Sequence, residues 1–486
     1  MADRRLTILQ INDTHGYVEP HPELFWEGGG VPAYRSAGGF ARLATVFRQA
    51  REQNPGGVLA LDNGDTFHGT YPVVASRGEV LVPLLSALGL DAMTAHWDFA
   101  YGPERLRHLT GQLPYPLLAL NGYDRESGAP AFEASRVLER GGVRVGVLGI
   151  AATIIDKTMP AHFSEGLRFT LGRDELPGHI RRLREEEGVE VVVVLSHLGF
   201  PQDLKLASEV AGIDVLLSGH THNRTFKPAR VGETLVIQSG SHGSFVGRLD
   251  LEVEKSGHVR KAAHSLIPVD DAFAPDPEMQ ALVEDAIAPH RARLAEVVGE
   301  TRVLLHRNTI FESPMDDLLL AAVAGAAGVG VAFSNGWRYG APVPPGPITE
   351  NDLWNMVPPD PPVSLTEMTG EQMRAMMEEN LERTFSCDPY AQMGGYVKRC
   401  RGVTLCVKLE NPAGERVQEF FVGNAPLDPA ATYTVAFLTD QGVPRRFGTN
   451  RRDLPVRAVE ALRTYLGRRD GGPVTGDEFP RTVIAV

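Results

Sequence analysis

Short runs of β-branched and apolar residues alternate with amphipathic stretches through residues 1–275 of the chain. The apolar runs end in polar or glycine-containing clusters, which is typical of buried strands. These runs are residues 5–12, 57–63, 143–150, 189–195, 213–218 and 234–239. Helical spacing of apolar residues appears between them at 40–51, 79–88 and 174–187. The alternation of strand and helix predicts an α/β layered domain.

The pattern changes at residues 276–300. Asp276-Pro277-Glu278-Met279 has the composition of a helix start, with proline suited to the first turn. Helical spacing continues to Val298, although Pro289 inside it predicts a kink or a break. We therefore expect a first domain at 1–275, a linking helix at 276–300 that is kinked or divided in two, and a second domain at 301–486.

The second domain shows a sparser pattern that still mixes helices and strands. Helices are predicted at 314–327 and 369–385, and strands at 402–409, 433–438 and 482–486. The proline-rich segments 342–347 and 358–362 are expected to be loops. This part of the chain is therefore predicted to be a smaller α/β or α+β domain.

Composition narrows the class of protein. The 486 residues carry a net charge of −13, which argues against a nucleic-acid-binding surface. No apolar stretch is long enough for a transmembrane helix, and three cysteines without a CxxC pair argue against a disulfide scaffold or a cysteine-built zinc site. The N-terminus lacks the core of a signal peptide. We expect a cytoplasmic chain, or a periplasmic one if a leader was removed; the oligomeric state stays open.

Aspartates and histidines follow the predicted strands of the first domain. In chain order the side chains are Asp13, His15, Asp65, His96, His197, His220 and His222. Open α/β sheets bind ligands at the carboxyl ends of their strands, so these positions are expected to converge on one crevice. Nitrogen and oxygen ligands without sulfur suit two divalent ions, for which manganese, zinc and iron are the candidates. The competing interpretation is a set of hydrogen-bonded histidines and helix-capping aspartates.

The motifs Asp13-x-His15, Gly64-Asp65, Ser196-His197 and Gly219-His220-x-His222 resemble those of the dinuclear metallophosphoesterases. The two-domain length makes the chain similar to the 5′-nucleotidase family within that superfamily. This resemblance implies a four-layer αββα metal domain joined by a helix to a C-terminal substrate domain. It also implies that Asp13, His15 and His222 hold one ion, that His197 and His220 hold the other, and that Asp65 bridges them.

One segment departs from the family. The family has Gly-Asn-His-Glu, in which Asn binds metal and His stabilises the leaving group, and an Asp three residues after that His orients it. If Asp98-Phe99 aligns with the family's Glu-Phe, His96 replaces the metal-binding Asn and Trp97 replaces the catalytic His. If His96 is instead the catalytic His, Ala95 stands at the metal-binding position. We favour the first alignment because imidazole can bind a metal and a methyl group cannot.

The His96-Trp97-Asp98-Phe99 segment resembles the SoxB branch, the thiosulfohydrolases of sulfur oxidation. Residues 62–69, 196–200, 239–243, 274–277 and 336–340 resemble that branch as well. The resemblance implies that two manganese ions are bound and that a cysteine S-sulfonate on a carrier protein is hydrolysed, with release of sulfate. A thiolate leaving group needs little protonation, which agrees with tryptophan in place of the acid. His68 and His242 are the candidates to supply a proton if one is needed.

The substrate side of the site is expected in the second domain. Asn335 and Arg338 lie in a segment that resembles the family's Asn/Gly/Arg segment, and the planar fork of Arg338 suits an anion. Phe447 can stack on a base or can be a packed loop residue. A membrane or a nucleic-acid polymer is not expected as a partner.

Three functions remain open from the sequence. The first is a metal-dependent hydrolase of the SoxB type, in which hydroxide on the metal attacks a cysteine S-sulfonate. The second is a 5′-nucleotidase or related phosphoesterase. The third is a metal-binding or docking protein that has lost catalysis with its acid.

Overall fold

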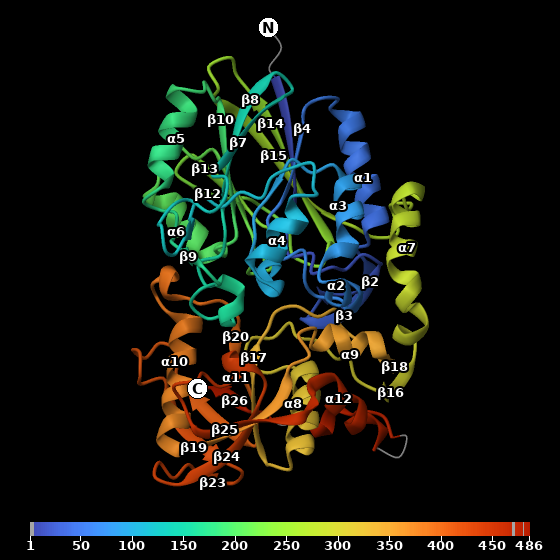
Figure 1. Ribbon diagram of the computed structural model, residues 1–486, viewed down its shortest axis with the longest axis vertical. Helices are drawn as coiled ribbons and strands as arrows, with labels where there is room; N and C mark the ends of the chain where they lie inside the picture. The colour runs from blue at the N-terminus through green and yellow to red at the C-terminus, as the bar shows by residue number, and fades with distance from the viewer. Residues whose placement is uncertain (1–3, 469–471, 480) are drawn as a thin grey trace. The chain divides into compact units, whose positions relative to one another are not determined.

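The computed structural model describes residues 4–468, 472–479 and 481–486 (Figure 1). The chain forms two compact units. The first extends up to His21 and then from Ser36 to Pro289, and the second contains Pro22–Arg35 and His290–Val486.

The first unit is built on two large sheets and also contains the two-stranded sheet of β6 (Gly122–Asp124) and β9 (Leu167–Phe169). One has the order β15-β14-β1-β4-β5, with β1 parallel to β4 and antiparallel to β14. The other has the order β12-β13-β11-β10-β8-β7, with β8, β10, β11 and β13 parallel. The strands of the first sheet are β1 (Arg4–Ile11), β4 (Val58–Asp62), β5 (Ala92–Met93), β14 (Phe245–Val253) and β15 (Val259–Pro268). Those of the second are β7 (Ser135–Arg140), β8 (Val143–Ile150), β10 (Val191–Ser196), β11 (Val215–Ser218), β12 (Ala229–Val231) and β13 (Thr234–Ile237).

The two sheets pack face to face on a core of valine, leucine and isoleucine. On β10, Val191, Val193 and Leu195 belong to this core, whereas Val192 and Val194 pack toward helices on the other face. Successive side chains on a strand point to opposite faces, so both faces of β10 are buried. Helices α1 (Phe40–Gln53) and α3 (Val82–Leu88) lie on one outer side, and α5 (Leu176–Glu185) and α6 (Phe200–Glu209) on the other (Figure 1). The predicted αββα layers are confirmed.

The second unit is built on a five-stranded sheet, β20-β17-β24-β19-β25, and a four-stranded sheet, β23-β22-β21-β26. Its core contains Phe333 and Phe437 together with Met373, Met376 and Met377 of α10. The strands are β17 (Val331–Gly336), β19 (Pro362–Thr369), β20 (Tyr396–Arg401), β21 (Val403–Val407), β22 (Val417–Val422), β23 (Ala425–Pro426), β24 (Thr432–Phe437), β25 (Thr449–Arg457) and β26 (Val483–Ala485). The helices are α8 (Pro314–Ala327), α9 (Glu350–Met356), α10 (Gly370–Phe385), α11 (Thr439–Gly442) and α12 (Ala458–Gly467).

The linking helix α7 (Pro277–Leu294) is a single element that continues through Pro289. The expectation that proline divides this segment is therefore wrong. Met279, Val283 and Ile287 are buried at helical spacing before the proline, and this packing favours the helix despite the missing N–H.

A hairpin of β2 (His21–Glu27) and β3 (Val31–Ala37) was not expected from the sequence. Its turn contains Gly28-Gly29-Gly30, and most of it belongs to the second unit. Among the residues that the structure describes, no helix combines the length and apolar character needed to cross a membrane.

Gly149 on β8 tests the packing of the first unit. A Cβ atom there would lie 2.2 Å from the carbonyl oxygen of Leu118, which belongs to backbone that cannot rotate away. We expect Gly149→Ala to lower the free energy of unfolding by about 1–3 kcal/mol through overpacking. Gly178→Ala on α5, where nothing lies within 4 Å, should raise it by up to about 1 kcal/mol. Urea unfolding followed by circular dichroism measures both, and equal stability of the two variants would contradict the packing described.

Candidate metal centre

The seven predicted ligands lie just beyond the carboxyl ends of neighbouring strands. Asp13 and His15 follow β1, Asp65 follows β4, and His96 follows β5. In the facing sheet His197 follows β10, and His220 and His222 follow β11. Parallel strands end at the same edge of a sheet, so the two sheets bring these side chains to one place.

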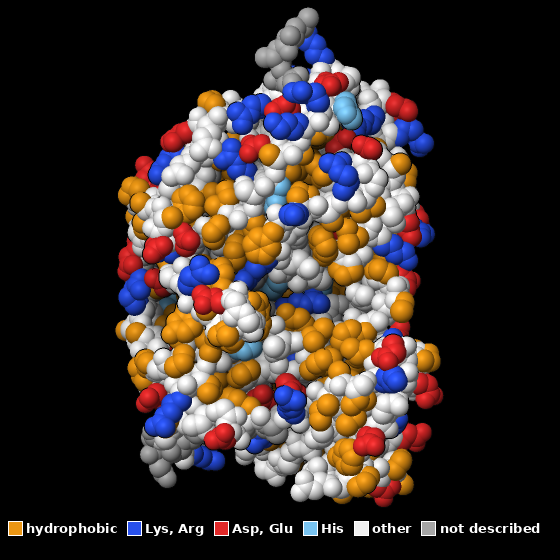
Figure 2. All heavy atoms as spheres, turned by 180° about the vertical axis from the view of Figure 1, so that it is seen from behind, with side chains coloured by type: hydrophobic (Ala, Val, Ile, Leu, Met, Phe, Trp, Pro, Cys, Tyr) orange, Lys and Arg blue, Asp and Glu red, His pale blue; other side chains and the backbone are white. Residues whose placement is uncertain are grey.

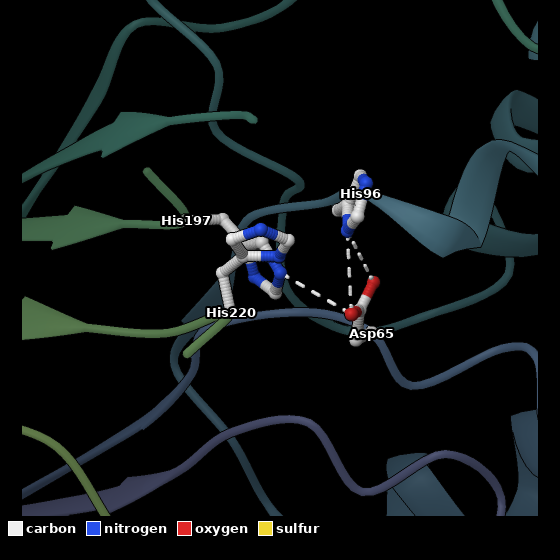
Figure 3. Close-up of side chains that lie close together, drawn as sticks. All are labelled: Asp65, His96, His197 and His220. Carbon is white, nitrogen blue, oxygen red and sulfur yellow. Dashed lines mark hydrogen bonds and ion pairs between the residues drawn. The ribbon is translucent and has the colours of Figure 1, made fainter. Parts of the chain in front are cut away.

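The side chains form two groups whose candidate ligand atoms lie within 4.8 Å of one another. The first group is Asp65, His96, His197 and His220, and Figure 3 shows the three imidazoles arranged around the carboxylate. The second group is Asp13, His15 and His222. All are buried except His222, which is partly exposed. Each group offers nitrogen and oxygen donors alone, a set that suits a divalent ion such as manganese, zinc or iron.

The two carboxylates connect the groups. Asp65 Oδ2 lies 3.3 Å from His197 Nε2 and 3.8 Å from His15 Nε2 in the other group. Asp13 Oδ1 lies 3.3 Å from His222 Nε2 and 3.6 Å from His197 Nε2. A carboxylate between two donor sets is the arrangement that a bridging ligand requires.

The tautomer of His197 shows why a cation fits here. Its Nδ1 lies 2.6 Å from the carbonyl oxygen of Asn63, which can only accept, so Nδ1 carries the proton. In a neutral ring the Nε2 lone pair then faces the carboxylates of Asp65 and Asp13 inside a buried site. Burial lowers the pKa of His197, but the two carboxylates raise it to about 10, so a proton takes the central position when no metal does. A divalent ion would satisfy the same lone pairs, and the residues present therefore fit a metal.

The backbone at the site adopts a conformation that most residues avoid. Asp13, His15, Asp65, His220 and His222 have positive φ values between 46° and 72°. Non-glycine residues rarely occupy this left-handed region, and clusters of them are typical of functional sites. The fold therefore holds five of the seven candidate ligands in conformations that only tertiary structure can maintain.

Asp98 organises the loops that carry Asp65 and His96. Its buried carboxylate accepts hydrogen bonds from the backbone N–H groups of Asp65, Thr66, Phe67 and His96, at 2.8–3.0 Å. Trp97 N–H in turn donates to Asp65 Oδ1 at 2.6 Å. From the sequence, Asp98 served only to align a motif, and its role in these loops was not predicted although its place in that motif was an available signal.

Asp203 connects the ends of two strands in the second sheet. Ser196 Oγ and Ser218 Oγ each lie 2.6 Å from one of its oxygens, directly before His197 and Gly219-His220. Burial raises the pKa of Asp203 to about 7, and the two serines oppose that rise. The sequence analysis missed this residue as well, although a serine precedes the histidine segment at both strand ends.

Trp97 and His68 lie together beside the first group. Their rings stack with centroids 4.8 Å apart, and Phe163 meets Trp97 edge-on at 5.5 Å. Both residues are buried. Burial lowers the pKa of His68 to about 4, so its ring is neutral near pH 7.

His242 lies beside the second group. Its ring centroid is 6.0 Å from those of His15 and His222 and 4.6 Å from that of Tyr17, and its backbone N–H donates to Asp13 O. His242 also has a positive φ of 58°. Its position agrees with a residue that supports the ligands.

The three predicted substrate residues all belong to the second unit. Arg338 donates to Gly395 O at 2.9 Å, and its guanidinium lies 5.4 Å from the ring centroid of Tyr396. Asn335 Nδ2 approaches Gln441 Oε1 at 3.5 Å. Phe447 packs against the core of the unit, beneath the guanidinium of Arg446.

The Asp98 carboxylate provides a test of the site. Asp98→Ala removes the acceptor of four backbone N–H groups, so we expect the affinity for Mn²⁺ to fall about 10–100-fold. Asp124→Ala is the matched control, because Asp124 also accepts backbone N–H groups but in an exposed turn, and it should leave the affinity unchanged. Equilibrium dialysis measures both. Wild-type affinity for Mn²⁺ in Asp98→Ala would show that the ligand-bearing loops keep their conformation without the Asp98 carboxylate.

Comparison with known proteins extends these observations. Residues 296–439 match the family model described as the 5′-nucleotidase C-terminal domain. The trifunctional nucleotide phosphoesterase YfkN of Bacillus subtilis is 25% identical over 486 aligned residues, which cover 89% of this chain and 31% of that longer protein. The chain therefore spans about a third of the length of this relative.

Two solved structures resemble the chain over nearly its whole length. The sulfate thiohydrolase SoxB of Thermus thermophilus, in complex with glycerol, superimposes with a TM-score of 0.91 at 28% identity, covering 100% of this chain and 97% of that one. A 5′-nucleotidase precursor, also of Thermus thermophilus, gives 0.85 at 25% identity and covers 99% of both. Together with the αββα layers and the two ligand groups, these matches support the 5′-nucleotidase family of metal-dependent hydrolases for this chain, with SoxB as a structural neighbour.

Proposed function

We propose that this protein is a SoxB-like hydrolase that cleaves a cysteine S-sulfonate and releases sulfate. The observation that carries this proposal is the aromatic wall formed by Trp97, His68 and Phe163 beside the first ligand group. No strong proton donor is found among these three side chains near pH 7. The site therefore suits a leaving group that departs without one.

The reaction balances without an external acid. Hydroxide adds to the sulfonate sulfur, the S–S bond breaks, and its electron pair leaves with the cysteine sulfur as a thiolate. The products are the free thiolate and hydrogen sulfate. A thiol has a pKa of about 8.5, so its anion is a far better leaving group than the alkoxide of a nucleoside.

The chain's own residues position the reactants. Asp65 is fixed by the Trp97 N–H, and the tautomer of His197 is fixed by Asn63 O, so both ligands keep their orientation. Two divalent ions, for which we propose manganese, would supply hydroxide near neutral pH and offset the charge of the sulfonate. Arg338 is proposed to grip the anionic substrate through its planar fork. The partner that this function implies is a carrier that presents the S-sulfonate on a cysteine.

A 5′-nucleotidase is the second candidate. It is favoured by the matched C-terminal domain at residues 296–439 and by Tyr396 beside Arg338, an aromatic and cationic pair in the second unit. Under this alternative the substrate is a nucleotide and the product is phosphate, and Asn335 and Phe447 contact the substrate. The proton for the leaving alkoxide would then have to come from water or from another histidine. His68, which stacks on Trp97, cannot supply it because its ring is neutral near pH 7.

Substrate choice is tested by measuring the released anion. Manganese-loaded protein should release sulfate from a peptide carrying a cysteine S-sulfonate and little phosphate from 5′-AMP. His197→Ala, which removes a ligand, is the control and should abolish turnover. Strong phosphate release with little sulfate would establish the nucleotidase instead. Two bound ions with neither activity would favour a metal-binding or docking protein.

Trp97 is tested by restoring an acid. Trp97→His should raise phosphate release from 5′-AMP at least about tenfold, because a general acid contributes about 10²–10⁴-fold. Trp97→Phe keeps an aromatic ring without a titratable group and should leave the rate low. Both variants should retain two metal ions, whereas His96→Ala should retain one. Equal rates in Trp97→His and Trp97→Phe, with both metals bound, would contradict the assignment of the missing acid to this position.

A further inference from the structure

A second pocket lies at the opposite edge of the first sheet from the metal centre. Arg51, Gly56, Val58, Gly89, Asp91 and Arg140 line it, and its volume is about 240 Å³. Val58 begins β4 and Asp91 directly precedes β5, so the pocket lies at the amino ends of two strands whose carboxyl ends lead to Asp65 and His96. Its volume is below the roughly 300–1,000 Å³ of pockets that hold drug-sized ligands, which favours a small ligand.

Arg51 leaves much of its donor capacity open in this pocket. Both of its hydrogen bonds in the described residues come from Nη2, which donates to Leu88 O at 3.0 Å and to Gly89 O at 2.6 Å. The Nε and Nη1 groups make none. A guanidinium presents five N–H donors in a planar fork that matches the oxygens of phosphate or sulfate. Arg51 is thus anchored through Nη2, while its Nε and Nη1 groups remain available to donate to a ligand.

The acidic residue of the pocket is already engaged. Asp91 Oδ1 pairs with Arg140 Nη2 at 2.5 Å, and Oδ2 accepts the N–H of Ala60 at 2.9 Å. The lining of the pocket therefore contains one carboxylate, that of Asp91, and two guanidinium groups, those of Arg51 and Arg140. Burial lowers the pKa of Arg51, Asp91 opposes this, and the positive charge of Arg140 lowers the pKa further. The pocket keeps an excess of one positive charge, which an anion would neutralise.

Lys and Arg side chains are also present on the surface at this end of the first unit. Figure 2 shows Lys and Arg side chains gathered at the end of the first unit that is drawn at the top, with Asp and Glu among them. β1 begins at this end and runs parallel to β4, so the amino ends of both strands lie here. Basic side chains near a concave site raise the local concentration of anions.

We propose that this pocket binds a small tetrahedral oxyanion, phosphate or sulfate, through Arg51 and Arg140. The anion is either free in solution or the phosphoryl group of a nucleotide. Gly89 makes the arrangement possible, because a Cβ atom there would lie 3.0 Å from Arg51 Nη2. The site is separate from the metal centre, so the proposal does not depend on the reaction catalysed there.

The test is calorimetric titration of the full chain with phosphate and with sulfate, in chelator so that no metal competes. One site with a dissociation constant of about 1 mM or tighter is expected. Arg51→Gln and Arg140→Gln should each weaken binding at least tenfold. Arg105→Gln is the matched control, since Arg105 is a comparably exposed, ion-paired arginine in the same unit, and it should bind as the wild type does. Binding that is absent, or that both pocket variants retain, overturns the proposal.

Two further arms keep the test decisive. Gly89→Ala should weaken binding without removing a charge, whereas Gly188→Ala, with a similar positive φ and nothing within 4 Å, should not. This pair remains informative if Arg140→Gln fails to fold because Asp91 loses its partner. Displacement of phosphate by 5′-AMP would identify the phosphoryl group of a nucleotide as a ligand. Exclusion of 5′-AMP would identify the free anion, and the site stands in either case.

Discussion

The metal centre depends on one unfavourable arrangement: the Nε2 atom of His197 faces two buried carboxylates. Asn63 O fixes the proton on the other ring nitrogen, so in the neutral ring a lone pair meets the negative charges of Asp65 and Asp13. Only a cation between the His197 lone pair and the two carboxylates removes this repulsion. That cation can be a proton or a metal ion. Because each carboxylate lies close to histidines of both ligand groups, a cation bound in one group also changes the electrostatic repulsion in the other.

The rest of the first unit maintains that arrangement. Two buried aspartates outside the ligand set hold the loops in place: Asp98 through four backbone N–H groups and Asp203 through two serine hydroxyls. The positive φ values of the ligands cost free energy that these contacts and the packed sheets must offset. The contacts of Asp98 and Asp203 therefore hold the ligand-bearing loops in place, which reduces the reorganisation needed on metal binding.

The sequence predicted the buried strands and the metal ligands, because each of these environments admits few residue types. Strands β10 and β11 are buried on both faces and consist of valine and leucine before a terminal serine, and Asp and His are common metal ligands. Strand β15 and strand β3 of the β2–β3 hairpin are largely exposed or partly exposed, so they lack such a run of apolar residues. The role of Asp98 was missed, because the hydrogen bonds that it accepts from backbone N–H groups leave no trace in the sequence beyond its place in the motif at residues 96–99. Pro289 shows the opposite error, since local rules predicted a break where burial of the helix face prevailed.

In the proposed function, Trp97 determines which leaving group the metal centre favours. Its backbone N–H orients Asp65, which any residue could do, but its side chain fills the space beside the ligands with an apolar ring stacked on His68. Burial lowers the pKa of that histidine to about 4, so the aromatic pair does not supply a proton near pH 7. Such a wall favours a polarisable sulfur leaving group over a strongly basic alkoxide, because the transition state of the sulfur substrate carries less charge that must be protonated. In the proposed function, tryptophan at the position of the acid thus favours cleavage of an S–S bond over a P–O bond.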